Sequence, residues 1–396
     1  MPLRARKRRQ CRGSREAAAG ASLGGELAAA RGLLDSDLVG GDNLGAMKIS
    51  RFRYNFRYSF NPRKPRLQWR IARAYLDLFS GRRHPLRYVD VNVGLACNLR
   101  CEHCFAENFH HRAAKELSNE EWASVISQAK DLGAIALGFT GGEPLAYSRL
   151  YDLIRLARPE EMLIIVCTNG TLLTPKKARE LRHVGVDIVQ MSVDSGDAEE
   201  HDRFRGREGA FEKTREAFRI AREAGLKVAA VPTVSHQNLH TEGFRRLIDW
   251  AEQEDILVNL SMAAPVGEWA DNRDCLLTPE DLAELNRLVS TKAHVRRDFE
   301  TNYWKQGCGA AIEKLYVTPF GDVIPCPYMH ISFGNVREAP LAAIRQKMCS
   351  NSYLKGFHPR CLTAEDEEFI DKHLPRQYLK GGALPRSEEI FGEGKP

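Results

Sequence analysis

Three closely spaced cysteines are the residues of this chain best suited to hold a metal centre. Cys97, Cys101 and Cys104 are separated by three and then two residues. Thiols at this spacing converge on one small object only if the loop wraps around it, as iron–sulfur clusters and zinc sites require. Three ligands leave one iron of a four-iron cluster open, whereas a structural metal site normally closes its own coordination shell. The spacing therefore predicts a centre that holds a reactant.

Short polar motifs follow the predicted strands downstream of these cysteines. Residues 140–144 read Thr-Gly-Gly-Glu-Pro, residues 168–171 read Thr-Asn-Gly-Thr, and residues 192–195 read Ser-Val-Asp-Ser. Paired glycines let the backbone approach a ligand closely, and the carboxylate of Glu143 can accept hydrogen bonds from an ammonium group. Turn formation and helix capping are the alternative role of each motif taken alone.

The elements that position these motifs alternate regularly between residues 88 and 262. Strands are expected over 88–93, 134–139, 162–167, 187–193, 227–233 and 257–262, and helices over 119–132, 175–183, 209–224 and 242–254. Such βα units predict a parallel sheet with right-handed crossovers, here an α/β fold with a partial (β/α)6 TIM-like barrel. Chemistry in such barrels lies at the carboxyl ends of the strands, where the motifs above fall.

A different pattern follows the sixth strand. A helix is expected over 278–288, a β-hairpin over 315–318 and 323–326, and a short helix over 340–347. We therefore expect a small C-terminal α+β domain with its own cysteines.

Taken together, the cysteine triplet and the three strand-end motifs resemble the radical S-adenosylmethionine (SAM) superfamily over about residues 86–265. The resemblance implies that Cys97, Cys101 and Cys104 ligate a [4Fe-4S] cluster whose open iron is chelated by the amino and carboxylate groups of SAM. In that family a one-electron reduction of SAM gives methionine and a 5′-deoxyadenosyl radical that abstracts a hydrogen atom, so the cofactor supplies the reactivity.

The resemblance also implies a SAM pocket built from these motifs. Gly142 and Glu143 would hold the methionine ammonium, and Thr168 and Ser192 would line the pocket. The remaining assignments place His103 against the adenine and Arg205 at the SAM carboxylate. The family more often has Tyr or Phe at the position of His103, and an imidazole can also stack.

Four cysteines in the C-terminal region form a second group, at Cys308, Cys326, Cys349 and Cys361. Their opening resembles the SPASM and twitch domains of radical SAM enzymes, which hold auxiliary iron–sulfur clusters. This chain lacks the dense seven-cysteine array of a full SPASM domain, and four thiols suffice for one auxiliary [4Fe-4S] cluster. Cys349 lies at the end of a predicted helix, and without it the cluster keeps an open iron. A four-cysteine zinc site is the alternative, although the gaps lack paired CxxC knuckles.

The front of the chain is strongly basic, and the net charge of +6 comes from it. Such a segment could meet nucleic acid, a phospholipid surface or an acidic peptide, or be a solvated tail. Residues 1–46 are expected to be disordered, or an artefactual extension ahead of a translation start at Met47. The apolar positions of a helix near 67–79 would pack beneath the barrel or form a membrane-surface or partner-binding face.

The sequence has no apolar run long enough to span a membrane and no apolar segment of a signal peptide, so we expect a cytoplasmic protein. Ten cysteines in a reducing compartment favour metal binding or catalysis over disulfides. The expected domains are a basic segment with a helix at 47–85, a radical SAM core at 86–300, a SPASM or twitch-like domain at 301–370 and a tail at 371–396.

We favour peptide or protein modification as the function, by analogy with superfamily members of this architecture. The alternative within enzymes is a small-molecule or tetrapyrrole transformation of the haem-pathway type. A rival of another class is a non-catalytic iron–sulfur or zinc protein that binds nucleic acid, but such a module has no need of a SAM pocket, and we do not expect nucleic acid as a partner. The expected partners are SAM, a peptide or protein substrate, and a reductant such as flavodoxin or ferredoxin.

Overall fold

A computed structural model describes residues 41–109, 114–303, 307–378 and 383–392. One curled sheet organises it, with strand order β10-β9-β1-β2-β3-β4-β5-β7-β6 and with β8 paired to β7. The strands are β1 (Tyr88–Asn92), β2 (Ala136–Thr140), β3 (Leu163–Thr168), β4 (Ile188–Met191), β5 (Lys227–Ala230), β6 (Thr233–Val234), β7 (Leu257–Met262), β8 (Val295–Arg297), β9 (Lys314–Val317) and β10 (Val323–Ile324). All pairings are parallel except that of β9 with β10, which confirms the predicted α/β partial barrel.

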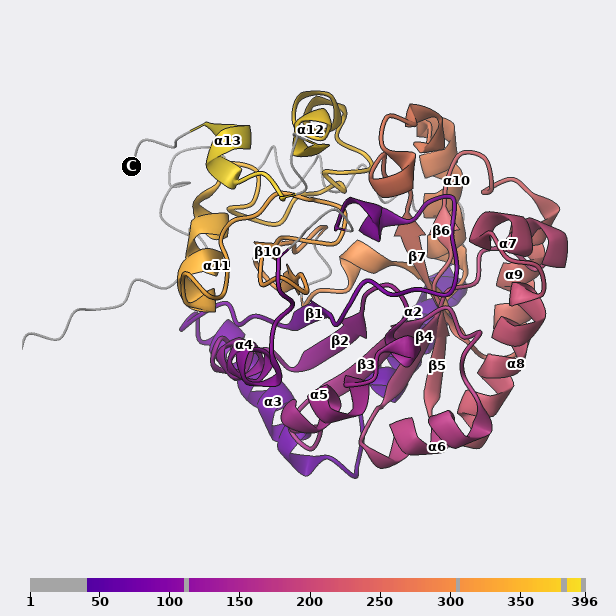
Figure 1. The fold of residues 1–396 in the computed structure, drawn as a ribbon. Helices are drawn as coiled ribbons and strands as arrows, with labels where there is room; N and C mark the ends of the chain where they lie inside the picture. The colour runs from indigo at the N-terminus through magenta and orange to yellow at the C-terminus, as the bar shows by residue number, and fades with distance from the viewer. Residues whose placement is uncertain (1–40, 110–113, 304–306, 379–382, 393–396) are drawn as a thin grey trace, which may run out of the picture.

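Helices cover the outer side of this sheet (Figure 1). They include α4 (Asn119–Asp131), α5 (Leu150–Leu156), α6 (Pro175–His183), α7 (Ala198–Arg205), α8 (Ala210–Glu223), α9 (Glu242–Gln253) and α10 (Pro279–Thr291). The start of α4 shows why these helices form where they do. Ser118 accepts a hydrogen bond from the Glu121 amide, the Glu121 carboxylate accepts one from the Ser118 amide, and Trp122, Val125 and Ile126 are buried against the sheet.

The sequence did not predict α5, α7 or β8. α5 has seven residues and α7 has eight, too few turns to show a clear helical period, and β8 has three. The strand expected over 227–233 is divided into β5 and β6 around Pro232, which has no amide hydrogen for a ladder hydrogen bond.

The predicted hairpin forms as β9 and β10, but it does not stand apart from the barrel. β9 pairs in parallel with β1, Tyr88 opposite Lys314 and Val91 opposite Val317, so the sheet continues into the C-terminal region. Leu315, Tyr316 and Val317 are all fully buried, and this apolar run needs cover on both faces. The helices α11 (Leu341–Ser350), α12 (Glu367–Lys372) and α13 (Ser387–Phe391) complete this region.

Two helices, α2 (Gly41–Ser59) and α3 (Pro65–Phe79), cross the amino-terminal ends of the strands. Tyr58 is buried in this end of the barrel and donates to the Val228 carbonyl. Lys64 is buried too, and its ammonium forms an ion pair with Asp187 and donates to the Gly185 carbonyl at 2.8 Å.

The expected boundary at residue 46 falls inside α2, and the remainder of the expectation for 1–46 concerns residues outside the described ranges. No helix in the described residues is long and apolar enough to cross a membrane.

Candidate functional site

The loop that carries Cys97, Cys101 and Cys104 follows β1 at the carboxyl end of the sheet. Cys97 is exposed and the other two thiols are partly buried. The loop rests on the Gly-Gly turn after β2, because the Gly142 amide donates to the Gly94 carbonyl at 2.9 Å and the Glu143 amide donates to the Ala96 carbonyl at 2.8 Å. The cysteine loop is therefore held by backbone hydrogen bonds from the second motif.

Glycine is required at this contact. A Cβ atom on Gly142 would lie 2.5 Å from the Ala96 carbonyl oxygen, and one on Gly141, whose φ is +146°, would lie 2.4 Å from the Gly94 carbonyl oxygen. Real Cβ atoms do not approach backbone oxygens so closely, so a side chain at either position pushes the cysteine loop away. The paired glycines serve the packing of two chain segments as well as any ligand.

Glu143 links the ends of β2 and β3. Its carboxylate is 2% exposed and accepts hydrogen bonds from the Thr168 hydroxyl at 2.6 Å, the Asn169 amide at 2.8 Å and the Leu145 amide at 2.9 Å. Burial raises the pKa of Glu143, and these three donors oppose that rise. The carboxylate expected to meet an ammonium group is thus already engaged by its own chain.

Arg205, at the end of α7, lies between β4 and the cysteine loop. Its Nε donates to Asp194 Oδ2 at 2.6 Å, and one terminal nitrogen lies 3.8 Å from Cys101 Sγ. Asp194 is buried and also accepts the Thr233 amide at 2.9 Å. Burial alone would raise the pKa of Asp194, but Arg205, His103 and His201 lower it below its usual value. A buried cation therefore stands beside a thiol of the cysteine loop.

His103 lies in an aromatic group formed with Phe204 and Trp269. Its ring stacks on Phe204 with centroids 4.3 Å apart, and Trp269 is 5.6 Å away. Its Nδ1 is buried without a hydrogen-bond partner. Burial and the nearby Arg205 guanidinium lower the pKa of His103 to about 3, so the imidazole is neutral near pH 7. An unsatisfied buried nitrogen at the cysteine loop fits a site that is completed by a bound group.

Thr168 and Ser192 lie beside each other at the ends of β3 and β4, where the Ser192 amide donates to the Thr168 carbonyl at 3.0 Å. Thr168 is buried and Ser192 is partly exposed. The structure thus brings the expected SAM-pocket residues to one end of the sheet. The structure adds Asp194, Phe204 and Trp269 to this group. Asp194 lies in the motif at residues 192–195, whereas no sequence pattern pointed to the two aromatic residues.

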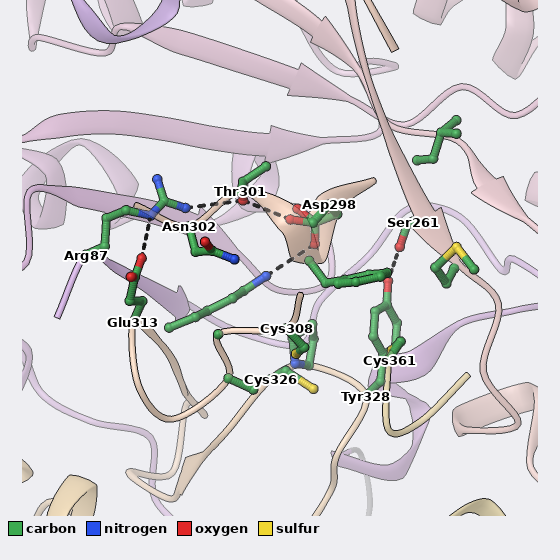
Figure 2. A pocket seen from close by; sticks show the side chains of 17 residues that line it. Arg87, Ser261, Asp298, Thr301, Asn302, Cys308, Glu313, Cys326, Tyr328 and Cys361 are labelled. Carbon is green, nitrogen blue, oxygen red and sulfur yellow. Dashed lines mark hydrogen bonds and ion pairs between the residues drawn. The ribbon is translucent and has the colours of Figure 1, made fainter. Parts of the chain in front are cut away.

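Three cysteines of the second group line a cavity where the C-terminal region meets the barrel. Cys308, Cys326 and Cys361 line it together with Tyr328 and Ser261 of β7, whose hydroxyls are hydrogen-bonded to each other (Figure 2). In the described residues no three Cys, His, Asp or Glu side chains gather tightly enough for a single metal ion. The three thiols instead surround a shared space, which suits a multi-iron cluster.

Cys349 lies elsewhere. It is on α11, its Sγ is 3.8 Å from the Ala311 carbonyl oxygen, and it is not among the residues that line this cavity. We expected four cysteines around one cluster, and in the structure three of the four line the same cavity. The physical reason is that α11 packs behind the 308–314 loop, with Arg345 held by the Ala311 and Ile312 carbonyls.

The polar side of the cavity is internally paired. Lys314 lies 3.3 Å from Asp298 and 3.6 Å from Asp90. Arg87 donates to Thr301 at 3.2 Å (Figure 2). Burial alone would lower the pKa of Lys314, but the two carboxylates raise it, so the ammonium stays charged. Burial and the neighbouring sulfurs of Cys361 and Cys326 raise the pKa of Cys308. Thiols in this position become thiolates readily only when a metal centre supplies positive charge.

Family models match both parts of the chain. A model described as the radical SAM superfamily matches residues 91–251, and one described as an iron–sulfur cluster-binding domain, SPASM, matches residues 308–364. These ranges contain the two cysteine sites described above, which means that the chain carries a [4Fe-4S] cluster that binds SAM and an auxiliary cluster.

Curated relatives of two kinds match. The AdoMet-dependent heme synthase of Nitratidesulfovibrio vulgaris is 27% identical over 333 residues, which span 76% of this chain and 88% of the relative. The PqqA peptide cyclase of Granulibacter bethesdensis is 29% identical over 265 residues, which span 63% of this chain and 70% of the relative. The two relatives differ in their named activities, one a heme synthase and the other a peptide cyclase.

Solved structures share the fold. Streptococcus suis SuiB bound to S-adenosylmethionine matches with a TM-score of 0.54 at 19% identity, over 79% of this chain and 82% of SuiB. The anSMEcpe protein with bound AdoMet matches with a TM-score of 0.54 at 17% identity, over 76% of this chain and 93% of that one. Cysteine loop, partial barrel and both family models agree, and the chain is an enzyme of the radical SAM superfamily with a SPASM-type iron–sulfur domain.

Proposed function

We propose that Cys97, Cys101 and Cys104 hold the cluster that binds SAM, and that Cys308, Cys326 and Cys361 hold the auxiliary cluster. The first assignment rests on the backbone hydrogen bonds and close packing between the cysteine loop and the Gly-Gly turn, because they hold the three thiols at the carboxyl end of the barrel. Bound there, the cluster and SAM supply a 5′-deoxyadenosyl radical that abstracts a hydrogen atom from the substrate.

The SAM pocket is assigned to the residues around this loop. Gly142 and Glu143 would bind the methionine ammonium through backbone oxygens, because the Glu143 carboxylate is engaged by three donors of its own chain. His103 would stack on the adenine with the face that Phe204 does not cover. The pocket would be completed by Thr168, Ser192 and Arg205, with Arg205 turning its remaining guanidinium nitrogens to the SAM carboxylate.

The substrate class that we favour is a peptide or protein. The PqqA peptide cyclases and the subtilosin biosynthesis protein AlbA of Bacillus subtilis support this choice.

A tetrapyrrole substrate is the second candidate. One observation favours it: the heme synthase relative matches 88% of its own length, more than the 70% of the peptide cyclase.

Cysteine-held clusters are sensitive to oxidation, so we place the activity in the reducing cytoplasm with a flavodoxin or ferredoxin as electron donor.

The first experiment is anaerobic reconstitution followed by iron analysis and incubation with SAM and dithionite. We expect about eight irons per chain and release of 5′-deoxyadenosine. Cys97→Ala serves as the control and should lose the 5′-deoxyadenosine while keeping about four irons. Equal 5′-deoxyadenosine from both proteins would refute the assignment of the cysteine loop.

The second experiment separates the two substrate classes. Titration with Fe-coproporphyrin III would give a saturable Soret shift and faster SAM cleavage if a tetrapyrrole is the substrate. A short peptide encoded beside the gene, tested in the same way, would instead gain a mass change after incubation with SAM. The peptide proposal fails if only the porphyrin stimulates SAM cleavage.

A further inference from the structure

The exposed large apolar side chains of the described residues are concentrated in one segment of the chain, which forms α2 and α3. Nine large apolar residues are exposed in the described part of the chain, and eight of them lie between residues 49 and 79, on α2, on α3 or at their ends. Phe52 is 68% exposed, Trp69 66% and Phe79 72%. Single exposed apolar residues are ordinary, but a concentration of this kind marks an interaction site.

Their spacing places them on one stripe of each helix. Ile49, Phe52 and Phe56 of α2 and Phe60 just after it recur at three- and four-residue intervals, and the Phe56 and Phe60 rings stack with centroids 4.7 Å apart. The opposite side of α2 carries Tyr58, which is buried in the barrel. The stripe therefore points away from the sheet.

On α3 the arrangement is the same. Trp69, Leu76 and Phe79 are exposed, whereas Leu67 and Ala74 are buried on the opposite side. We call the outward stripes of the two helices, Phe52, Phe56, Phe60, Trp69, Leu76 and Phe79, the apolar patch.

The segment that carries the apolar patch is strongly basic, although Arg57 is paired with Asp255 and Lys64 with Asp187. Residues 49–83 contain ten Lys and Arg residues and a single acidic residue, Asp77. Asp77 is buried and paired with Arg83 at 2.7 Å. Arg53 and Arg73 are exposed beside the apolar stripes. A surface of this kind is complementary to a partner that is both negatively charged and apolar.

The apolar patch lies at the end of the barrel opposite the cysteine loop. Its helices contact the starts of the strands: Tyr58 meets Val228, Lys64 meets Asp187, and Arg70 donates to the Ala134 carbonyl at 2.7 Å. The cysteine loop follows the carboxyl end of β1. Anything bound at the apolar patch therefore leaves the mouth of the barrel open.

We propose that the apolar patch docks this enzyme on an anionic phospholipid surface, with the aromatic and aliphatic side chains inserted at the headgroup level and the arginines on lipid phosphates. Helices with an aromatic stripe and flanking arginines are suited to this interface. Each basic residue near an anionic membrane adds attraction, which insertion of apolar side chains supplements. This binding is independent of the radical chemistry.

The test is sedimentation of the full-length protein with vesicles of phosphatidylcholine alone or with about 30% phosphatidylglycerol. We expect at least roughly tenfold tighter binding to the anionic vesicles, weakened by salt. A blue shift of Trp69 fluorescence should accompany binding and be absent from Trp69→Phe. Absence of binding to the anionic vesicles would overturn the proposal.

Matched variants locate the binding surface. Phe52→Ser with Phe56→Ser, and separately Arg53→Glu with Arg73→Glu, should each weaken binding by roughly tenfold or more. The control variants are Leu156→Ser, at an exposed apolar residue far in sequence from α2 and α3, and Lys213→Glu on α8, and both should bind like the unaltered protein. Every variant should cleave SAM normally, which verifies the fold.

Three results would contradict the apolar patch as a lipid-binding surface. If both double variants bind anionic vesicles like the unaltered protein, the attraction comes from another part of the chain. If the unaltered protein is a dimer that Phe52→Ser with Phe56→Ser converts to a monomer, and vesicles bind neither, a second copy covers the patch. Binding of an acidic flavodoxin in place of vesicles would also reject the lipid.

Discussion

At the scale of single residues, His103 shows how a departure from the family pattern is accommodated. Its neutral ring stacks on Phe204 at 4.3 Å and offers no charge to a ligand. We propose that the flat face of the ring, more than its unpartnered Nδ1, is what this position presents to the adenine of SAM. A phenyl ring provides the same flat face.

The matched pair His103→Phe and His103→Ala tests this role. We expect His103→Phe to keep the KM for SAM within about threefold, and His103→Ala to raise it by about tenfold, because base stacking on a ring contributes about 1–3 kcal/mol. Initial rates of 5′-deoxyadenosine formation at varied SAM give both values. A phenylalanine variant as weak as the alanine variant would instead assign a polar role to the imidazole.

At the scale of elements, the turn after β2 acts by fitting closely against the cysteine loop. We predict that Gly142→Ala loses the SAM-binding cluster, because its Cβ would lie 2.5 Å from the Ala96 carbonyl oxygen. Reconstituted protein should hold about four irons in place of eight. The control is Gly356→Ala, since a Cβ there meets no atom within 4 Å. Unchanged iron in Gly142→Ala would show that the loop can move aside.

The start of α10 is held by a buried carboxylate with two histidines. Asp281 accepts the Thr278 amide at 2.9 Å, His236 at 2.7 Å and His240 at 2.6 Å. Burial alone would raise the pKa of Asp281, but the Thr278 amide and the two imidazoles lower it to about 2. A carboxyl group with a depressed pKa stabilises the fold when ionised, so this contribution is present above the unfolded pKa of about 4 and is lost as the pH falls toward 2.

Asp281→Asn should therefore lower the free energy of unfolding by about 2 kcal/mol at pH 7. The difference in free energy of unfolding between the variant and the unaltered protein should shrink as the pH falls from 5 to 3. Protonation of Asp281 then removes the stabilisation that its ionised form gives the native state. Urea unfolding followed by circular dichroism at each pH measures both proteins. If the difference in free energy of unfolding stays constant with pH, the substituted amide side chain destabilises the protein for steric reasons and not through the loss of charge.

At the scale of the whole molecule, the C-terminal region closes the open side of the partial barrel. Cys326 and Tyr328 follow β10 and meet Ser261 of β7, so the auxiliary site lies between strands that do not pair with each other. Phe105, next to Cys104, contacts Tyr328 with ring centroids 5.8 Å apart. The two cluster sites therefore face one shared interior.

The cysteines of the second group should differ in their effect on iron content. Cys361→Ala should reduce the reconstituted protein from about eight irons to about four, whereas Cys349→Ala should keep about eight, because Cys349 does not line the cavity. Iron analysis with electron paramagnetic resonance of the reduced proteins measures both. Equal loss in the two variants would make Cys349 the fourth ligand.

Much of this arrangement could be predicted from local patterns. The capping residues at Ser118 and the short apolar runs of β1 to β4 act over a few positions, so the sequence determined the succession of strands and helices and the parallel sheet. The same locality limited the prediction where elements were short, as with α5, α7 and β8.

By itself the sequence determined the two cysteine groups, the strand-end motifs and the α/β class, because each depends on residue type and spacing along one segment. Only the tertiary structure decided that the Glu143 carboxylate serves Thr168 and Asn169, that Cys349 lies outside the cavity, and that β9 extends the barrel sheet. Each of these depends on which surfaces meet after folding. Contacts between distant segments are set by packing and hydrogen-bond satisfaction over the whole molecule, which no local pattern encodes.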